Sequence, residues 1–238
     1  MRIDGRAPDE LRPTTIIPGF QAFAEGSALI EVGQTKIICT ATVEERVPAW
    51  LRSSGKGWVT AEYSMLPRST ISRTPRSGDG RPGGRTYEIQ RLIGRSLRAA
   101  TDMEALGQRT IVLDCDVLQA DGGTRTAAVT GAYVALYQAL MNLVHHRVLP
   151  SVPLRCAVAA TSVGIVDGAQ MLDMCYEEDA RAEVDFNIVM TNRGEFVELQ
   201  GTGERAPFPQ ETADGLMSLA QQGIEYLLEV QRIVIDTL

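Results

Sequence analysis

The sequence predicts an α+β protein in which mixed sheets pack against helices, as a single domain over residues 1–238. Both halves of the chain contain segments typical of strands, followed by a segment typical of a helix. The composition is that of a globular protein, with 44% hydrophobic and 22% charged residues. The chain is long enough to bury a sizeable core. The two halves could come from a repeated unit, although no strong internal sequence repeat accompanies them.

The first half begins with predicted strands. Residues 28–33 and 35–43 indicate a hairpin with its turn at residues 33–34, because β-branched residues are frequent in both arms. Residues 57–64 predict another strand. Residues 67–85 are rich in Arg, Ser, Thr, Gly and Pro, and this composition is typical of a loop that either links elements or carries function.

Helices alternate with strands after this loop. Apolar residues at helical spacing predict a helix over residues 86–100. Its expected buried face consists of Ile89, Leu92, Ile93, Leu97 and Ala100. Residues 110–118 predict a strand, which leads through residues 121–125 into an uncharged helix that ends near residues 145–146. Because the helix is bounded by predicted sheet, we expect it to lie in the core.

The second half repeats this order. Residues 155–166 are apolar and predict a long strand. Further strands are expected over residues 169–177, 183–191 and 195–200. A helix over residues 210–229 completes the predicted fold.

Charge is distributed unevenly along the chain. The net charge is −7, but residues 46–98 contain eleven Lys or Arg against three Asp or Glu. This excess is almost all Arg, interleaved with Gly and Pro, and Arg matches phosphate geometry. The segment therefore indicates either a polyanion-binding region or a solvated charged surface. Aromatic residues make up only 5%, which argues against binding by extensive base stacking.

Several classes of protein fit poorly. The four cysteines form no CxxC pair, which predicts free thiols in a reducing compartment. The first residues lack the apolar stretch of a signal peptide, and the uncharged residues 126–144 are interrupted by polar side chains. We therefore expect a cytoplasmic protein with no membrane segment. The chain has only two histidines, both at a helix end, which argues against a histidine triad or a zinc site.

Two glycine pairs precede predicted helices. One is followed by Arg85, and the other continues from Gly123 into Thr124 and Arg125. Helix N-termini carry unpaired N–H groups and partial positive charge, glycine allows close approach, and Arg and Thr add directed donors. Each loop is a candidate phosphate site. The alternative for either loop is a tight turn with a capping Thr.

Acidic residues gather near residues 173–185. On one straight strand, Asp179 and Asp185 would be about 20 Å apart. A hairpin reversal at residues 180–182 would bring them to about 5 Å from each other. Two carboxylates beside a bound phosphate suit Mg²⁺. The alternative is an exposed acidic turn.

Four segments resemble the ribonuclease PH family. They are GWVTAEYSMLPRST at residues 57–70, GGRTYEIQRLI at 83–93, LDCDVLQADGGTRT at 113–126, and YEED at 176–179, followed by Asp185. The similarity extends over roughly residues 1–205. It implies a fold like that of domain 2 of ribosomal protein S5, and assembly into a homohexameric ring built as a trimer of dimers.

The resemblance also implies an activity. Members of this family are tRNA nucleotidyltransferases: they remove nucleotides beyond the 3′-CCA end of tRNA precursors with inorganic phosphate, releasing nucleoside diphosphates. The reverse reaction adds nucleotides, and other RNA 3′ ends, including those of rRNA, are further substrates.

The resemblance assigns roles to individual residues. The phosphate-binding residues are Arg85, Gly123, Thr124 and Arg125. The residues linked to Mg²⁺ are Asp179 and Asp185, which together with Arg85 and Arg125 form the catalytic set. The residues of the tRNA-contacting loop are Arg68, Arg73 and Arg76.

One position departs from the family pattern. An acidic residue is usual where this chain has Cys175, so a metal site tuned by that acid would differ in affinity. Two other interpretations stay open. A non-catalytic RNA-binding ring subunit would keep the fold, and a hydrolytic nuclease would use the carboxylates but would leave the two phosphate loops unexplained.

Overall fold

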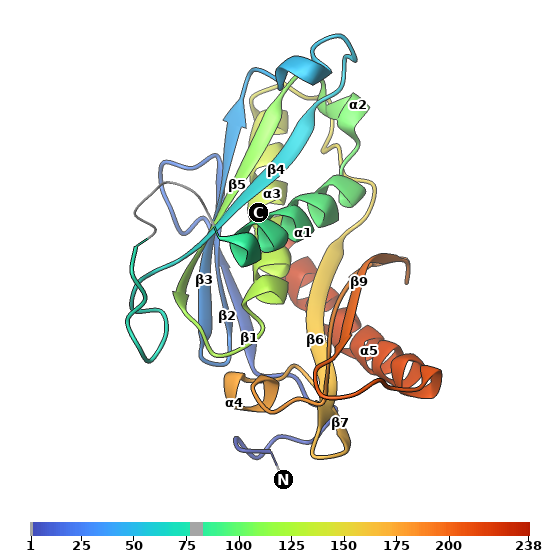
Figure 1. Cartoon of the computed structure of the whole chain (residues 1–238). Coiled ribbons are helices and arrows are strands. Elements are labelled where there is room, and N and C mark those ends of the chain that lie inside the picture. Colours follow the sequence, from blue (N-terminus) through green and yellow to red (C-terminus); the bar gives the residue numbers. More distant parts are fainter. Residues whose placement is uncertain (1, 77–82) are drawn as a thin grey trace.

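The computed structural model describes residues 2–76 and 83–238, and it has helices between and behind two β-sheets (Figure 1). The first sheet has the order β1-β2-β3-β5-β4, with β4 parallel to β5 and the other neighbours antiparallel. Its strands are β1 (Thr14–Pro18), β2 (Gly26–Val32), β3 (Thr35–Glu44), β4 (Trp58–Met65) and β5 (Thr110–Gln119). This is the mixed α+β architecture expected from the sequence.

The second sheet is antiparallel, with the order β7-β6-β8-β9. Its strands are β6 (Val158–Val166), β7 (Ala169–Leu172), β8 (Val184–Thr191) and β9 (Phe196–Gly203). The helices are η1 (Ala49–Leu51), α1 (Gly84–Ala100), α2 (Met103–Leu106), α3 (Thr124–His145), α4 (Tyr176–Asp179) and α5 (Gln210–Ile235).

The core lies on both sides of the second sheet. Alternate residues of a strand point to opposite faces. Val158 and Ala160 of β6 therefore belong to the core formed with α3 and the first sheet, whereas Ala159 and Val163 pack with α5. The two sheets, α3 and α5 thus form one packed framework, which fixes the positions of the loops that connect them.

Helices α1 and α3 follow the sequence prediction closely. The five apolar residues expected on one face of α1 are all buried. Helix α3 is long and apolar enough to cross a membrane by composition, but it is largely buried among strands and other helices of the protein. It is a core helix, as its mixture of small and polar residues predicts.

The region between β7 and β8 differs from the prediction. The strand expected over residues 169–177 ends at Leu172, and the one-turn helix α4 follows. Asp173 has a φ of 52°, in the left-handed region, so it cannot continue a strand. The hairpin interpretation was therefore wrong: α4 and a short turn reverse the chain before β8. Strand β1, η1 and α2 were not predicted, and α5 extends six residues beyond the expected end at Glu229.

Candidate active site

The loop between β5 and α3 is shaped by two glycines. Gly122 and Gly123 have φ values of 75° and 62°, in the region that other residues rarely adopt. A Cβ atom on Gly122 would lie 2.6 Å from the carbonyl oxygen of Met174 and 2.8 Å from the backbone nitrogen of Tyr176. Glycine at this position therefore lets the loop lie directly against the chain segment that leads into α4.

Helix α3 begins at the end of this loop with its backbone donors available. Gly123 occupies the N-cap position and offers no capping side chain. The first N–H groups of a helix have no partner within the helix, and they carry partial positive charge. The hydroxyl of Tyr63 on β4 donates to Oγ1 of Thr124 over 2.9 Å, which orients the Thr124 side chain.

Arg125 is held from two sides. Its Nη1 donates to Oε1 of Gln200 on β9 over 3.2 Å, and the same atom lies 3.5 Å from Oε2 of Glu88 on α1. Nε2 of Gln200 in turn donates to Oε1 of Glu88 over 2.9 Å. Arg85 stands in the first turn of α1, so a second helix N-terminus contributes an arginine to the same place.

The two carboxylates come from different elements. Asp179 ends α4, and Asp185 lies in β8, where Nδ2 of Asn187 donates to its Oδ2 over 3.1 Å. Burial and the neighbouring charge of Asp179 raise the pKa of Asp185 to about 6. Burial also raises the pKa of Asp179, against the opposing influence of Arg85 and Arg125. Asp179 is therefore close enough for its charge to affect the protonation of Asp185.

The two arginines, the loop before α3 and the two acids border one cavity of about 280 Å³. Every residue that the sequence assigned to phosphate or metal binding lines it: Arg85, Gly123, Thr124, Arg125, Asp179 and Asp185. Other side chains at its walls are Met65, Thr70, Ser162, Met174, Tyr176 and Asn187. The structure thus brings two arginines, a helix N-terminus and two acids to one concave surface.

The predicted tRNA-contacting arginines lie outside this cavity. Arg68, Arg73 and Arg76 are exposed in the segment that follows β4. Thr70 of the same segment lines the cavity, and Arg76 borders a neighbouring groove along β4, β5 and α1. The remainder of the expected 67–85 loop includes residues 77–82, which lie outside the described part of the chain.

Several residues of the site were not identified from the sequence. Tyr63, Gln200 and Asn187 each orient a predicted residue, and Ser162 and Tyr176 line the cavity. Tyr63 could have been found, since alternation along β4 places it on the same face as Ala61, toward the core. The others depend on contacts between distant elements, which a pattern in one segment cannot reveal.

Cys175 takes a structural position. It is the N-cap residue of α4, it is buried, and its backbone N–H donates to Oε2 of Glu178 over 3.1 Å. Burial raises the pKa of its thiol, so the thiol stays protonated near neutral pH. Cys175 does not line the cavity, so the departure from the family pattern lies at the helix cap and outside the cavity wall.

Comparison with known proteins identifies relatives over nearly the whole chain. Residues 10–142 match the 3′ exoribonuclease family, domain 1, and residues 156–223 match domain 2 of the same family. Ribonuclease PH from Dehalococcoides mccartyi is 57% identical over 232 residues, covering 97% of this chain and 96% of that protein. Ribonuclease PH from Solibacter usitatus is 56% identical over 237 residues, covering 99% and 100%.

Solved structures with the same fold are more distant in sequence. A chain of the Archaeoglobus fulgidus exosome, solved with RNA bound to the active site, has a TM-score of 0.83 at 23% identity and covers 96% of this chain and 91% of its own. A chain of an archaeal exosome core has a TM-score of 0.77 at 22% identity, covering 97% and 91%. At the identity of the two bacterial relatives, the family is shown: the chain belongs to the ribonuclease PH family of phosphorolytic 3′–5′ exoribonucleases.

Proposed function

We propose that this phosphorolytic 3′–5′ exoribonuclease trims nucleotides beyond the 3′-CCA end of tRNA precursors, and that the cavity between α1, α3, α4 and β8 is its active site. The observation that carries the proposal is the meeting of two cationic helix N-termini with two carboxylates in one cavity. A site for hydrolysis alone would have no need of the first of these features. Inorganic phosphate is then a substrate, and no protein nucleophile is required.

Phosphate binding falls to the loop before α3 and to the start of α1. The N–H groups of α3, the Thr124 hydroxyl and the guanidinium groups of Arg85 and Arg125 are donors, and Gly123 leaves room for the anion. Because Gln200 and Glu88 already hold Arg125, little orientational freedom is lost when phosphate binds.

The carboxylates fit a magnesium site. Mg²⁺ commonly uses one or two carboxylates and takes its other ligands from substrate and water, and Asp179 and Asp185 line the same cavity as the proposed phosphate site. Burial and the neighbouring charge of Asp179 raise the pKa of Asp185, and a cation bound between the two acids would offset this charge. Asp179 and Asp185 would hold the ion, which would neutralise negative charge on the transferring phosphoryl group.

In this reaction the protein positions the two substrates and forms no covalent bond to either of them. An oxygen of the bound phosphate forms a bond to the phosphorus of the last phosphodiester, and the bond from that phosphorus to the 3′ oxygen of the preceding ribose breaks. The 3′ oxygen takes up a proton, so the products are a nucleoside diphosphate and an RNA shortened by one nucleotide. Arg85 and Arg125 hold the attacking phosphate in line and stabilise the developing charge.

The RNA reaches the cavity past the segment that follows β4. Arg68, Arg73 and Arg76 are exposed there, and Thr70 connects this segment to the cavity. Contacts to phosphate carry no sequence information. We therefore assign these arginines to gripping the tRNA backbone, so that the 3′ end alone is selected.

We further propose that both matched halves act as one catalytic domain in a cytoplasmic homohexamer, arranged as a trimer of dimers. The cavity takes Arg85 and Arg125 from the first matched half and Asp179 and Asp185 from the second, which supports a single functional unit. Membership of a family whose distant structural relatives are exosome chains supports a ring.

The decisive experiment uses a tRNA with extra 3′ nucleotides and Mg²⁺, with and without inorganic phosphate, and identifies the released nucleotide by chromatography. Nucleoside diphosphates released only with phosphate are the expected result. Monophosphates released without phosphate would mean hydrolysis. Bound but uncut RNA would favour a non-catalytic ring subunit instead.

A further inference from the structure

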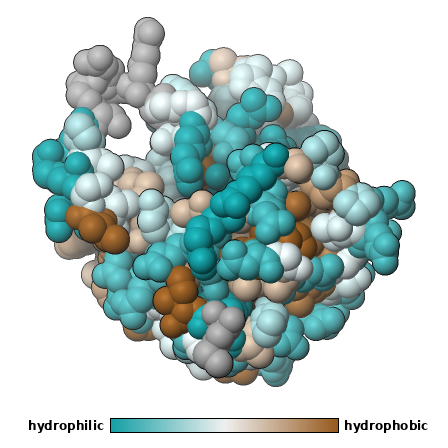
Figure 2. All heavy atoms as spheres, turned by 60° about the horizontal axis from the view of Figure 1, so that its bottom comes forward, coloured by the Kyte–Doolittle hydropathy of each residue, from teal (hydrophilic) through white to brown (hydrophobic). Residues whose placement is uncertain are grey.

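The first residues of the chain cross the end of the molecule where α4 and β7 lie. Figure 2 shows this end with a mainly hydrophilic surface and hydrophobic residues in separate small groups. Three arginines from residues 2–12 turn inward and are buried at their charged ends. Arg2 pairs with Glu178 over 2.7 Å, and both Arg2 and Arg6 donate to the carbonyl oxygen of Asp173. This segment is therefore anchored to the chain around α4.

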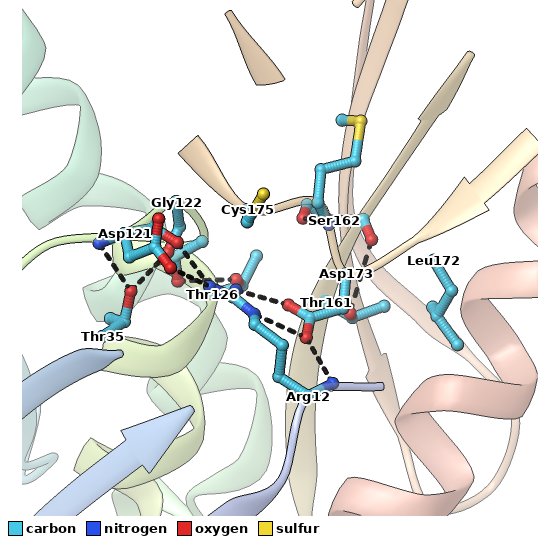
Figure 3. Close-up of polar contacts among 12 residues, drawn as sticks. Arg12, Thr35, Asp121, Gly122, Thr126, Thr161, Ser162, Leu172, Asp173 and Cys175 are labelled. Atoms are coloured by element: carbon cyan, nitrogen blue, oxygen red, sulfur yellow. Dashed lines mark hydrogen bonds and ion pairs between the residues drawn. The ribbon is translucent and has the colours of Figure 1, made fainter. Parts of the chain in front are cut away.

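Arg12 makes the most directed of these contacts (Figure 3). Its Nε donates to Oδ2 of Asp173 over 2.9 Å, and its Nη2 donates to Oδ1 over 2.6 Å. The backbone N–H of Arg12 donates to the same Oδ2 over 2.8 Å. The exposed fractions of the two side chains are 4% and 5%, so this bidentate pair is removed from solvent.

The remaining nitrogen of Arg12 connects this pair to the phosphate loop. Nη1 donates to the carbonyl oxygen of Asp121, the residue before the two glycines. Thr35 fixes the other side of the loop: its hydroxyl donates to the carbonyl oxygen of Gly122 over 2.7 Å and accepts from the N–H of Asp121 over 2.9 Å. The phosphate loop is thus held between β3 and Arg12.

The acidic segment is connected to the same loop. The N–H of Tyr176, at the start of α4, donates to Oδ1 of Asp121 over 3.3 Å. Gly122 lies against the backbone of residues 174–176. Asp173 stands two residues before the α4 N-cap and has a left-handed φ of 52°, so its position sets where α4 starts and hence where Asp179 lies. Asp173 is therefore one of several contacts that hold the phosphate loop and the acidic segment in fixed relative positions.

Neither Arg12 nor Asp173 lines the cavity, so we assign neither of them a direct contact with the substrates. A buried ion pair is in itself a weak source of stability, because desolvation offsets much of the attraction. What this pair does supply is geometry, since it ties the loop that follows β5 to the segment that follows β7. These segments belong to different matched halves of the family, and both deliver groups to the active site.

We propose that Arg12 and Asp173 are positioning residues that set the phosphate loop at the correct distance from the carboxylates of Asp179 and Asp185. This inference rests on the proposed active site. The pair acts through the loop backbone and through α4. A displacement of about 1 Å in such a site can reduce the rate about a hundredfold.

The test uses Arg12→Lys and Asp173→Asn, each of which keeps the approximate size of its side chain and removes the bidentate geometry. We expect each to raise the KM for phosphate about tenfold and to lower kcat, whereas RNA affinity without phosphate, measured by fluorescence anisotropy, changes less than about twofold. The double variant should be as active as the less active of the two single variants, because both substitutions remove the same connection.

Gln231→Leu is the matched control. Gln231 is also buried, and its Nε2 links the two halves by donating to the carbonyl oxygens of Thr130 and Val158 over 2.9 and 3.0 Å, but it does not border the cavity. Its loss should lower the unfolding temperature and leave the phosphate KM unchanged. If the Arg12–Asp173 pair served folding alone, Arg12→Lys and Asp173→Asn would likewise lower the unfolding temperature and leave the KM for phosphate unchanged.

The outcomes separate this proposal from the function on which it rests. Wild-type protein without phosphate-dependent release would overturn the proposed activity itself. Active wild-type protein together with folded variants of unchanged phosphate KM would overturn the positioning role alone. Should one single variant fail to fold, the other decides, since either substitution removes the bidentate pair. If the effects of the two substitutions on the KM for phosphate multiplied in the double variant, Arg12 and Asp173 would act independently, which would also contradict the proposal.

Discussion

Among the side chains proposed to bind phosphate, Arg125 is held by contacts from two other elements. Gln200 and Glu88 fix its guanidinium from β9 and α1. A hydrogen bond to a charged group contributes about 1.5–3 kcal/mol, more than a neutral one. We therefore expect Arg125→Ala to raise the KM for phosphate about tenfold or more in steady-state phosphorolysis. Arg91→Ala, an exposed arginine of α1, is the control and should behave as wild type.

An unchanged phosphate dependence in Arg125→Ala would remove this residue from the phosphate site. Arg125→Lys distinguishes charge from geometry. Lysine keeps the positive charge but cannot form a bidentate contact, so the lysine variant should fall between alanine and wild type.

Asp185 is expected to act on turnover rather than on RNA binding. Asp185→Asn removes a negative charge while keeping the side-chain size, and we expect kcat to fall about 10²–10³-fold in a titration with Mg²⁺. RNA affinity should change little. Asp167→Asn, in the exposed turn between β6 and β7, is the control with wild-type kinetics. Wild-type turnover of Asp185→Asn at every Mg²⁺ concentration would contradict the metal assignment.

Sequence patterns indicated the residues proposed to bind substrate better than the residues that orient them. Arg85, Thr124, Arg125 and the two acids lie in short motifs, and each motif has a local physical meaning at a helix end or a turn. The partners Gln200 and Asn187 come from strands of the second sheet, and their roles depend on tertiary distances. The pairing of Arg12 with Asp173 spans 161 residues, so no local pattern indicates it.

Among the elements, the loop between β5 and α3 gives the sharpest test of the site architecture. Gly122→Ala combines a strained positive φ with a clash against the backbone of residues 174–176. Gly55 has a nearly equal φ of 73° and open space around it, so Gly55→Ala carries the strain without the clash. We expect unfolding free energy to drop about 1 kcal/mol in Gly55→Ala and clearly more in Gly122→Ala.

Chemical denaturation measures this difference, and phosphorolysis adds a functional reading. Only Gly122→Ala should lose activity, because its clash displaces the phosphate loop and α4 from each other. Equal stability losses in the two variants would mean that the loop does not depend on close approach to α4.

Elements with strong periodicity were predictable, and those created by single contacts were not. The apolar spacing of α1 and the β-branched residues of β3 determine these elements from within. Helix α4 has only four residues: Arg2 pairs with Glu178 inside it, and Asp173 just before it takes a left-handed conformation. The sequence predicted that the preceding strand continues through residues 173–177, because no local pattern marks the end of β7 at Leu172.

At the scale of the whole molecule, stability depends on the buried ion pair between Arg2, near the start of the chain, and Glu178 in α4. Burial alone would raise the pKa of Glu178. Hydrogen bonds from Arg2 and from the Cys175 N–H lower the pKa by more than burial raises it, so the pKa lies below its usual value. The stabilisation is present above the unfolded value of about 4.3 and is lost as pH falls through the lower folded value. Glu178→Gln should therefore be less stable than wild type near neutral pH.

Below the unfolded pKa this difference should shrink, because the wild-type carboxyl is then protonated as well. Unfolding temperatures measured for both proteins between about pH 3 and pH 7 test the sign. Curves that stay parallel over this whole range would show that Glu178 does not supply acid-sensitive stability.

Assembly is the other property of the whole molecule. We expect sedimentation velocity to find a species of six chains at micromolar concentration. The architecture within one chain followed from alternating strand and helix patterns, but ring formation was expected only from the family resemblance. A monomer at all concentrations would contradict the ring while leaving the chemistry of the cavity unaffected.

The buried arginines of residues 2–12 also bear on how the enzyme is made. Arg12 is synthesised 161 residues before Asp173. At about 5–20 residues per second, it waits roughly 10–30 s for its partner during translation. The phosphate loop emerges in the meantime, but it cannot be locked against the carboxylates that come later. Nuclease activity should therefore arise only after residues 173–185 of each chain have been synthesised.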